Sequence, residues 1–501
     1  MKQVQKKSVG NRPAPPASWF VPDLALSRSI RVFLVLLVLT LLGACVPLDH
    51  EEMVGDFPVV PRDSYNSARI NSFLTLKDDE GPAIRLEVAS IEVLINDIWL
   101  PLNRNPLKFD SVAIGTGQLF LGGLNVPPGN YQQLRLTVSK AEVQNAEGKY
   151  IEVIKDPLVL RLPIAGGLNL QAEDSRSLLF SWDVENSLLQ DNRLQPVLTV
   201  VAPTRQLQLD LVFVTCPDID TVFIVRADNN WVVDSFGIKG RPTNLAIDPD
   251  TSSQRLYVLC PGDRMLKVVD LSSYRILDFF PVPLNDTPTF MTISPDAQNA
   301  YLLDEQSGYL SRMNLSTGRI SARVQLGYRP MYAMYLKDQN LLAVSLALSQ
   351  RVQLLDPTSL STMGTITTGS TPRGMAVADN QLYVAESGDN SVSVTDLNNH
   401  SSQSRLMVGF DPRRLLNAGN QLYVSNYHDG SLSVLLPGQL GVVQEIFDLG
   451  RPLEMTYDEF YHRVYAADEK AAALAVINAN ANQFIRRIYL GAKPFGLAVI
   501  Q

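Results

Sequence analysis

Residues 372–396 read PRGMAVADNQLYVAESGDNSVSVTD, and this stretch decides the fold because its pattern recurs through the second part of the chain. Prolines that each open a short apolar run stand at positions 242, 288, 330, 372, 412, 452 and 494, with spacings of 46, 42, 42, 40, 40 and 42 residues. An aromatic residue in the next run recurs in nearly the same register. Each repeat holds four short apolar runs divided by turn residues, which is the pattern of one four-stranded propeller blade.

The number of blades follows from the two ends of this region. Six proline-to-proline intervals give six blades. Residues 211–236 supply only the second, third and fourth strands of another blade, and residues 495–500 supply only a first strand. We therefore predict a seven-bladed β-propeller over residues 206–501, closed by a C-terminal strand that covers an otherwise open sheet edge.

Two runs of the repeat also carry a family resemblance. LYVAE at residues 382–386 and DNSVSV at residues 389–394 resemble the YVTN-type propeller repeats of bacterial exported and surface proteins. The resemblance implies the propeller fold and brings no single activity with it.

The region before the repeats predicts a second all-β domain. Residues 66–205 contain runs such as IEVLI at residues 91–95, whose period of two indicates strands with one buried face. About seven such strands predict an Ig-like β-sandwich. The stretches VPPGNYQQLRL, LPIAGGL, WDVENS and LQPV, which begin at positions 126, 162, 182 and 194, resemble an uncharacterised sandwich domain of bacterial lipoproteins. That family has no known activity to transfer.

The N-terminal segment predicts export and lipid attachment. Arg28 and Arg31 precede an apolar run over residues 32–42, which is too short to span a bilayer. The following Gly43-Ala44-Cys45 resembles the lipobox of bacterial lipoproteins, which implies a signal peptide over residues 1–44, a diacylglycerol on Cys45 and a membrane anchor. The alternative is a buried cysteine after an apolar core strand.

The residues after Cys45 indicate where the protein resides. Residues 45–65 are polar and contain three prolines, so they suit a tether. Val46 follows the cysteine, a pattern that resembles outer-membrane sorting. We therefore expect a bacterial cell-envelope protein, anchored in the outer membrane and facing the periplasm or the cell surface.

The composition of the chain argues against several classes of partner and cofactor. Residues 1–44 hold six Lys or Arg and one Asp, so their removal takes the formal net charge from −8 to −8 − 5 = −13, which argues against nucleic acid as a partner. The chain has three cysteines and four histidines without ligand spacing, so no metal or cofactor is predicted.

Cys216 and Cys260 occupy equivalent repeat positions too far apart for a disulfide, so we expect reduced, partly buried thiols. We expect a monomer.

Cations recur beside the periodic prolines, on the links that join one blade to the next. These links lie on the same propeller face as the turns between the second and third strands. Convergent cations there favour carboxylates and phosphates, so they predict a site for an anionic ligand or an acidic peptide. His428, between Tyr427 and Asp429, is a further candidate on this face. The cations are Arg241, Arg329, Arg373, Arg413, Arg451 and Lys493.

A structural interpretation of the same face stays open. Acids in the turns between the second and third strands are numerous enough to neutralise every cation; they are Asp218, Asp220, Asp263, Asp304, Glu386, Asp389, Asp429 and Asp468. The leading hypothesis is a non-enzymatic binding scaffold for an envelope protein, peptide or glycan. The alternative is a lactonase-like hydrolase that uses these acids, because propellers of similar repeat include lactone hydrolases. A third hypothesis is a purely structural spacer.

Overall fold

The computed structural model describes residues 67–500 except residues 79–80, 104, 190–192, 205–209, 283–287 and 328. The predicted signal peptide over residues 1–44, the candidate lipidation site Cys45 and the tether over residues 45–65 lie outside the described residues. Among the described helices, none is long and apolar enough to cross a membrane.

The N-terminal strands form a sandwich-like, nearly closed sheet. Its main path runs β3-β2-β6-β8-β10-β9-β1-β5, while β4 pairs with β2 and β7 pairs with β6. The sheet has ten strands where about seven were expected, because β3, β4 and β7 are only three or four residues long and lack a visible alternation. The strands are β1 (Ala68–Leu76), β2 (Ile84–Ile95), β3 (Ile98–Pro101), β4 (Leu107–Asp110), β5 (Gln118–Val126), β6 (Gly129–Gln144), β7 (Tyr150–Glu152), β8 (Leu158–Leu170), β9 (Ser175–Asp183) and β10 (Val197–Val201); a short helix, α2 (Ser111–Ile114), follows β4.

The core of this sheet follows the predicted alternation. In β2, buried and more exposed residues alternate along most of the strand. Trp182 and Phe109 are fully buried, and the Trp182 indole donates a hydrogen bond of 3.1 Å to Ser187. The one buried face that the sequence predicts is therefore the face that packs in the core.

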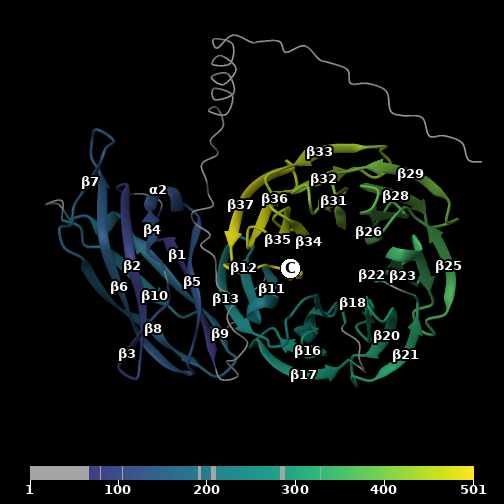
Figure 1. Cartoon of the computed structure of the whole chain (residues 1–501), viewed down its shortest axis with the longest axis horizontal. Coiled ribbons are helices and arrows are strands. Elements are labelled where there is room, and N and C mark those ends of the chain that lie inside the picture. Colours follow the sequence, from purple (N-terminus) through teal and green to yellow (C-terminus); the bar gives the residue numbers. More distant parts are fainter. Residues whose placement is uncertain are drawn as a thin grey trace, which may run out of the picture. The chain divides into compact units, whose positions relative to one another are not determined.

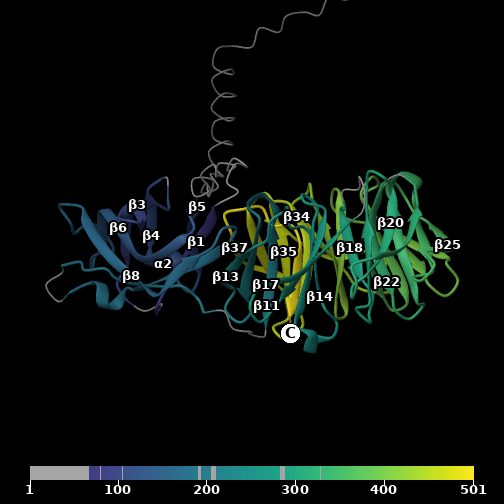
Figure 2. The same cartoon turned by 90° about the horizontal axis from the view of Figure 1, so that it is seen from below.

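Seven four-stranded antiparallel sheets follow and form the propeller, which confirms the predicted all-β fold and blade number. In the view along its axis, the inner strands β18, β22, β26 and β34 lie nearest the centre (Figure 1). The strands run between the two faces of the ring (Figure 2). The first four sheets are blade 1, with β11 (Leu211–Cys216), β12 (Thr221–Arg226), β13 (Trp231–Gly237) and β38 (Leu497–Ile500); blade 2, with β14 (Leu245–Ile247), β15 (Arg255–Cys260), β16 (Met265–Asp270) and β17 (Arg275–Pro281); blade 3, with β18 (Phe290–Ile293), β19 (Asn299–Leu303), β20 (Tyr309–Asn314) and β21 (Ile320–Gln325); and blade 4, with β22 (Pro330–Leu336), β23 (Leu341–Leu346), β24 (Arg351–Leu355) and β25 (Thr362–Thr367). The other three are blade 5, with β26 (Pro372–Ala378), β27 (Gln381–Glu386), β28 (Ser391–Asp396) and β29 (Ser402–Met407); blade 6, with β30 (Pro412–Ala418), β31 (Gln421–Asn426), β32 (Ser431–Leu435) and β33 (Val442–Ile446); and blade 7, with β34 (Pro452–Asp458), β35 (Arg463–Asp468), β36 (Ala473–Asn478) and β37 (Gln483–Tyr489).

The two ends of the propeller meet in blade 1. β38 pairs antiparallel with β11, from Leu211 opposite Ile500 to Val214 opposite Leu497. The backbone N–H of Gly496 donates to the Thr215 hydroxyl at 2.7 Å. The predicted strand closure is therefore confirmed.

Aromatic residues of the repeat fill the spaces between blades. These residues are at most 2% exposed. They lie on the second strand of each blade, which has strands of its own sheet on both edges and a neighbouring blade against each face. Cys216 and Cys260 are free thiols, and both are fully buried, more than the expected partial burial. Burial raises the pKa of both thiols, so they stay protonated. The buried tyrosines of the repeat are Tyr257, Tyr301, Tyr383, Tyr423 and Tyr465.

The outer strand of blade 1 is covered by the N-terminal sheet. The amide of Gln118 bonds the backbone of Val232 in both directions, at 3.0 and 2.8 Å. The hydroxyl of Ser235 accepts from Asn71 at 3.2 Å and from Ser177 at 3.1 Å. Gln118 thereby satisfies backbone groups at a sheet edge that would otherwise be unpaired, and the Ser235 bonds join the two sheets through side chains.

Candidate anion-binding face

The candidate site lies on the upper face, defined here as the turns between second and third strands together with the links between blades. The acids of these turns hold the links by accepting backbone N–H groups. Asp468 accepts from the N–H groups of Gly450 and Arg451, at 2.8 and 2.9 Å. Asp220 accepts from the N–H of Arg241 at 2.7 Å. Because these acids fix the backbone, they orient the cations at the same time.

Three of the predicted cations lie beside a single acid each. Arg241 is 3.5 Å from Asp218. Arg329 is 2.8 Å from Glu305, and Lys493 is 3.6 Å from Glu469. Glu305 and Glu469 directly follow the expected acids Asp304 and Asp468. The carboxylate of Asp304 accepts a backbone N–H of its own turn, and that of Asp468 accepts backbone N–H groups of its own turn and of the link.

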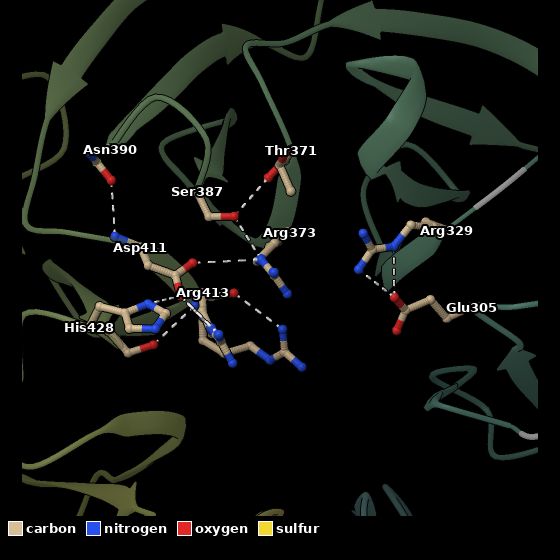
Figure 3. Close-up of polar contacts among 11 residues, drawn as sticks. Glu305, Arg329, Thr371, Arg373, Ser387, Asn390, Asp411, Arg413 and His428 are labelled. Carbon is tan, nitrogen blue, oxygen red and sulfur yellow. Dashed lines mark hydrogen bonds and ion pairs between the residues drawn. The ribbon is translucent and has the colours of Figure 1, made fainter.

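Arg373, Arg413 and His428 share one carboxylate, that of Asp411 (Figure 3). The Arg413 Nη2 atom lies 2.9 Å from Asp411 Oδ2, and the His428 Nδ1 atom lies 2.6 Å from the same oxygen. The Arg373 Nε atom lies 4.0 Å from Asp411 Oδ1. Asn390 positions Asp411 by accepting its backbone N–H at 3.0 Å. Two guanidinium groups and an imidazole thus surround a single acid.

Arg373 is mostly buried and lies near other arginines. Its side chain is 19% exposed, and its Nε donates to the Ser387 hydroxyl at 2.7 Å. Burial lowers the pKa of Arg373, and the neighbouring Arg413 lowers this pKa further, against the opposite effect of Asp411. Arg414 and Arg329 lower it as well. Arg329 and Arg414 each have an acid of their own, Glu305 and Glu454, whereas Arg373 and Arg413 have only Asp411 between them among the described residues.

An aromatic ring supports the cations from one side. The guanidinium carbon of Arg413 lies 3.5 Å from the centre of the Tyr427 ring, and that of Arg451 lies 5.6 Å from the same centre. The Tyr427 hydroxyl donates to Glu469. No carboxylate in the described part of the chain forms an ion pair with Arg451. We call Arg373, Asp411, Arg413, Tyr427, His428 and Arg451 the Asp411 cluster.

The sequence placed the cations on this face but missed Asp411 and the stacking role of Tyr427. Asp411 directly precedes Pro412, at a repeat position that holds Arg241, Arg329, Arg451 or Lys493 in other blades. An acid at a repeat position where most other blades have a cation could have indicated that Asp411 pairs with cations of this face. The contact of Arg413 with Tyr427 depends on side-chain direction, for which the repeat pattern carries no signal.

The hydrolase hypothesis relies on acids of the upper face. Within the ranges that the structure describes, no three His, Cys, Asp or Glu side chains lie close enough together to hold a metal ion. Glu386, one of the acids that the hydrolase hypothesis needs, accepts from the Gly369 backbone and the Ser391 hydroxyl and pairs with Arg405 at 3.0 Å. These contacts use its oxygens structurally.

Comparisons with known proteins support the propeller fold and assign no activity to the chain. Neither a protein-family model nor a curated protein matches the chain. A functionally unknown protein from Desulfotomaculum acetoxidans DSM 771 is similar with a TM-score of 0.52 and 14% identity, over 58% of this chain and 99% of that one. Dihydro-heme d1 dehydrogenase NirN in complex with DHE has a TM-score of 0.45 and 12% identity, over 57% and 66% of the two chains. Kuenenia stuttgartiensis hydrazine synthase has a TM-score of 0.45 and 13% identity, over 51% and 88%. At these identities the first likeness shows the fold alone.

Proposed function

We propose that this protein is a lipid-anchored binding scaffold of the bacterial cell envelope, without enzymatic activity, and that the Asp411 cluster binds an acidic partner. The observation that carries the proposal is the charge imbalance around Asp411. Arg373 and Arg413 share this one carboxylate, and Arg451 has no acidic partner among the described residues. A carboxylate or phosphate of a partner supplies the missing negative charge.

The geometry of the cluster also suits an acidic partner. A guanidinium group presents its N–H donors in a planar fork that matches a carboxylate. Stacking on Tyr427 and the bond to Asp411 hold the Arg413 fork in one orientation. Because less side-chain freedom is then lost on binding, the face is preorganised for association.

The N-terminal segment supports the location that we propose and narrows the class of partner. A Cys45 anchor followed by a tether over residues 45–65 places the propeller near a membrane surface. We propose the outer membrane, and an envelope protein, peptide or carboxylate-bearing glycan as the partner. A single propeller suffices for this binding, so the proposal requires no oligomer.

A defined acidic peptide tests the binding site. We expect fluorescein-labelled hexaglutamate to bind the purified chain and to bind the double variant R373Q/R413Q on the order of tenfold more weakly, because two charge-assisted contacts are lost. The matched control is Arg323→Gln, since Arg323 also stacks on a tyrosine, Tyr309, at 3.7 Å, but on the outer strand β21. Equal peptide affinity for the wild type and the double variant would contradict the proposal.

A further inference from the structure

The seven residues that stand two positions after the periodic prolines belong to the inner strands or to the residues next to them. The backbone position repeats from blade to blade, whereas the side chain at this position differs. We call these residues the inner ring: Asn244, Phe290, Tyr332, Gly374, Arg414, Glu454 and Gly496.

Side chains of four blades meet within the inner ring. Arg414 is 8% exposed, and its Nε lies 3.0 Å from Glu454 Oε2. Its guanidinium carbon lies 5.1 Å from the centre of the Tyr332 ring and 5.6 Å from that of Phe290. These two rings have their centres 4.4 Å apart. Gly374 makes room for this arrangement, because a Cβ there would lie 2.7 Å from the Arg414 Cα atom.

A cavity of about 370 Å³ adjoins the inner ring. It reaches Pro249, Pro295 and Lys337, which belong to the turns between first and second strands. These turns lie on the propeller face opposite the Asp411 cluster. Its volume falls within the range of sites for small organic molecules. The apolar part of its wall includes Leu245, Met291, Ile293, Met334 and Leu497.

A few polar groups of the inner ring also line this cavity. Asn244 is 5% exposed, and its Oδ1 atom has no hydrogen-bond partner among the described residues. Glu454 uses one oxygen for Arg414, and within the described part of the chain its other oxygen accepts only a long bond of 3.4 Å from the Met455 N–H. A buried amide oxygen without a hydrogen bond costs free energy, and a carboxylate can only accept. The wall therefore offers acceptor groups to a guest.

The charge of the wall decides what kind of guest fits. Glu454 is balanced by Arg414 at 3.0 Å, so this pair carries no excess charge. Lys337, the other charged residue of the wall, is exposed at the edge of the cavity, where solvent surrounds it. Burial raises the pKa of Tyr332, so its hydroxyl is neutral. We propose that the cavity binds a small uncharged molecule with an apolar body and a hydrogen-bond-donating head, directed to Asn244 and Glu454. This site is separate from the Asp411 cluster and does not depend on the proposed function.

Indole and indene test this proposal, because they have nearly the same shape and differ by one N–H donor. We expect calorimetry with the full chain to show that indole binds on the order of tenfold more tightly than indene, the value of one buried hydrogen bond. In the Asn244→Leu variant, we expect indene to bind and the preference for indole to fall to at most about threefold.

The control is Asn480→Leu, in an exposed asparagine that lines a different groove on the same propeller face. We expect this variant to keep the wild-type preference. The wild-type measurement stands even if the Asn244→Leu variant fails to fold, in which case Asn244→Ser replaces it. Absence of indole binding to the wild type, equal binding of the two compounds, or loss of the preference in the Asn480→Leu variant would each overturn the proposal.

Discussion

The guanidinium carbon of Arg413 lies 3.5 Å from the centre of the Tyr427 ring. This contact predicts that the ring of Tyr427, and not its hydroxyl, supports binding of an acidic partner. We expect Tyr427→Phe to keep the affinity for hexaglutamate and Tyr427→Leu to lower it about threefold to tenfold, the range of a cation–π contact. Fluorescence anisotropy measures both. Equal affinities for the Phe and Leu variants would remove the ring from the site.

The closure of the ring predicts a large effect of the last residues on stability. Removing residues 494–501 exposes the edge of β11 and deletes the buried side chains of Leu497 and Ile500. We expect the melting temperature to fall by more than about 10 °C. Calorimetry measures the shift, and removal of Gln501 alone is the control. An unchanged melting temperature would mean that the C-terminal strand does not hold the ring closed.

A half-buried acid, Glu445, predicts a pH-dependent change in stability. Burial raises the pKa of Glu445 above its value in the unfolded chain, and its Oε2 atom has no partner among the described residues. The charged form therefore costs stability at neutral pH, and this cost disappears as the pH falls below the unfolded value of about 4.3. We expect Glu445→Gln to raise the melting temperature at pH 7.5 and to have no effect at pH 4.

The control for this prediction is Glu459→Gln, because Glu459 is exposed. We expect it to change stability little at either pH. If Glu445→Gln stabilised the protein equally at pH 7.5 and pH 4, the gain would come from something other than the buried charge.

The proposed anchor predicts incorporation of fatty acid at one cysteine. We expect cells that express the chain to label it with radioactive palmitate, and Cys45→Ser to abolish the label, because the thiol accepts the diacylglycerol. Cys216→Ser is the control, since its thiol is buried in the propeller. Equal labelling of the wild type and the Cys45→Ser variant would refute the anchor.

The propeller was predictable because its repeat fixes strand order. The prolines at 330, 372, 412 and 452 each begin an inner strand, so their spacing measures one blade directly. The N-terminal sheet was less predictable. Its alternation reveals which side chains are buried, but the parallel pairing of β1 with β9 joins segments far apart in the chain. Local pattern contains no signal for such a pairing.

The candidate site was predictable in position and not in its contacts. Arg373 and Arg413 follow periodic prolines, so the sequence placed both on the links. Their common ion pairing with Asp411 depends on how two adjacent links turn, and Asn390 of another turn accepts the Asp411 backbone N–H. Glu305 and Glu469 were missed because the repeat places a turn without saying which of two neighbouring residues points outward.

The hexaglutamate affinity of an Asp411→Asn variant tests the central claim most directly. Asp411 lies beside Arg373 and Arg413, next to the place where we propose that the partner's carboxylate binds, so its negative charge repels that group. Asparagine keeps an oxygen acceptor for Arg413 and removes the competing charge. We expect the variant to bind hexaglutamate on the order of tenfold more tightly than the wild type, and Arg373→Gln to bind it more weakly. Unchanged or weaker binding by a folded Asp411→Asn variant would contradict the assignment of this cluster to an acidic partner.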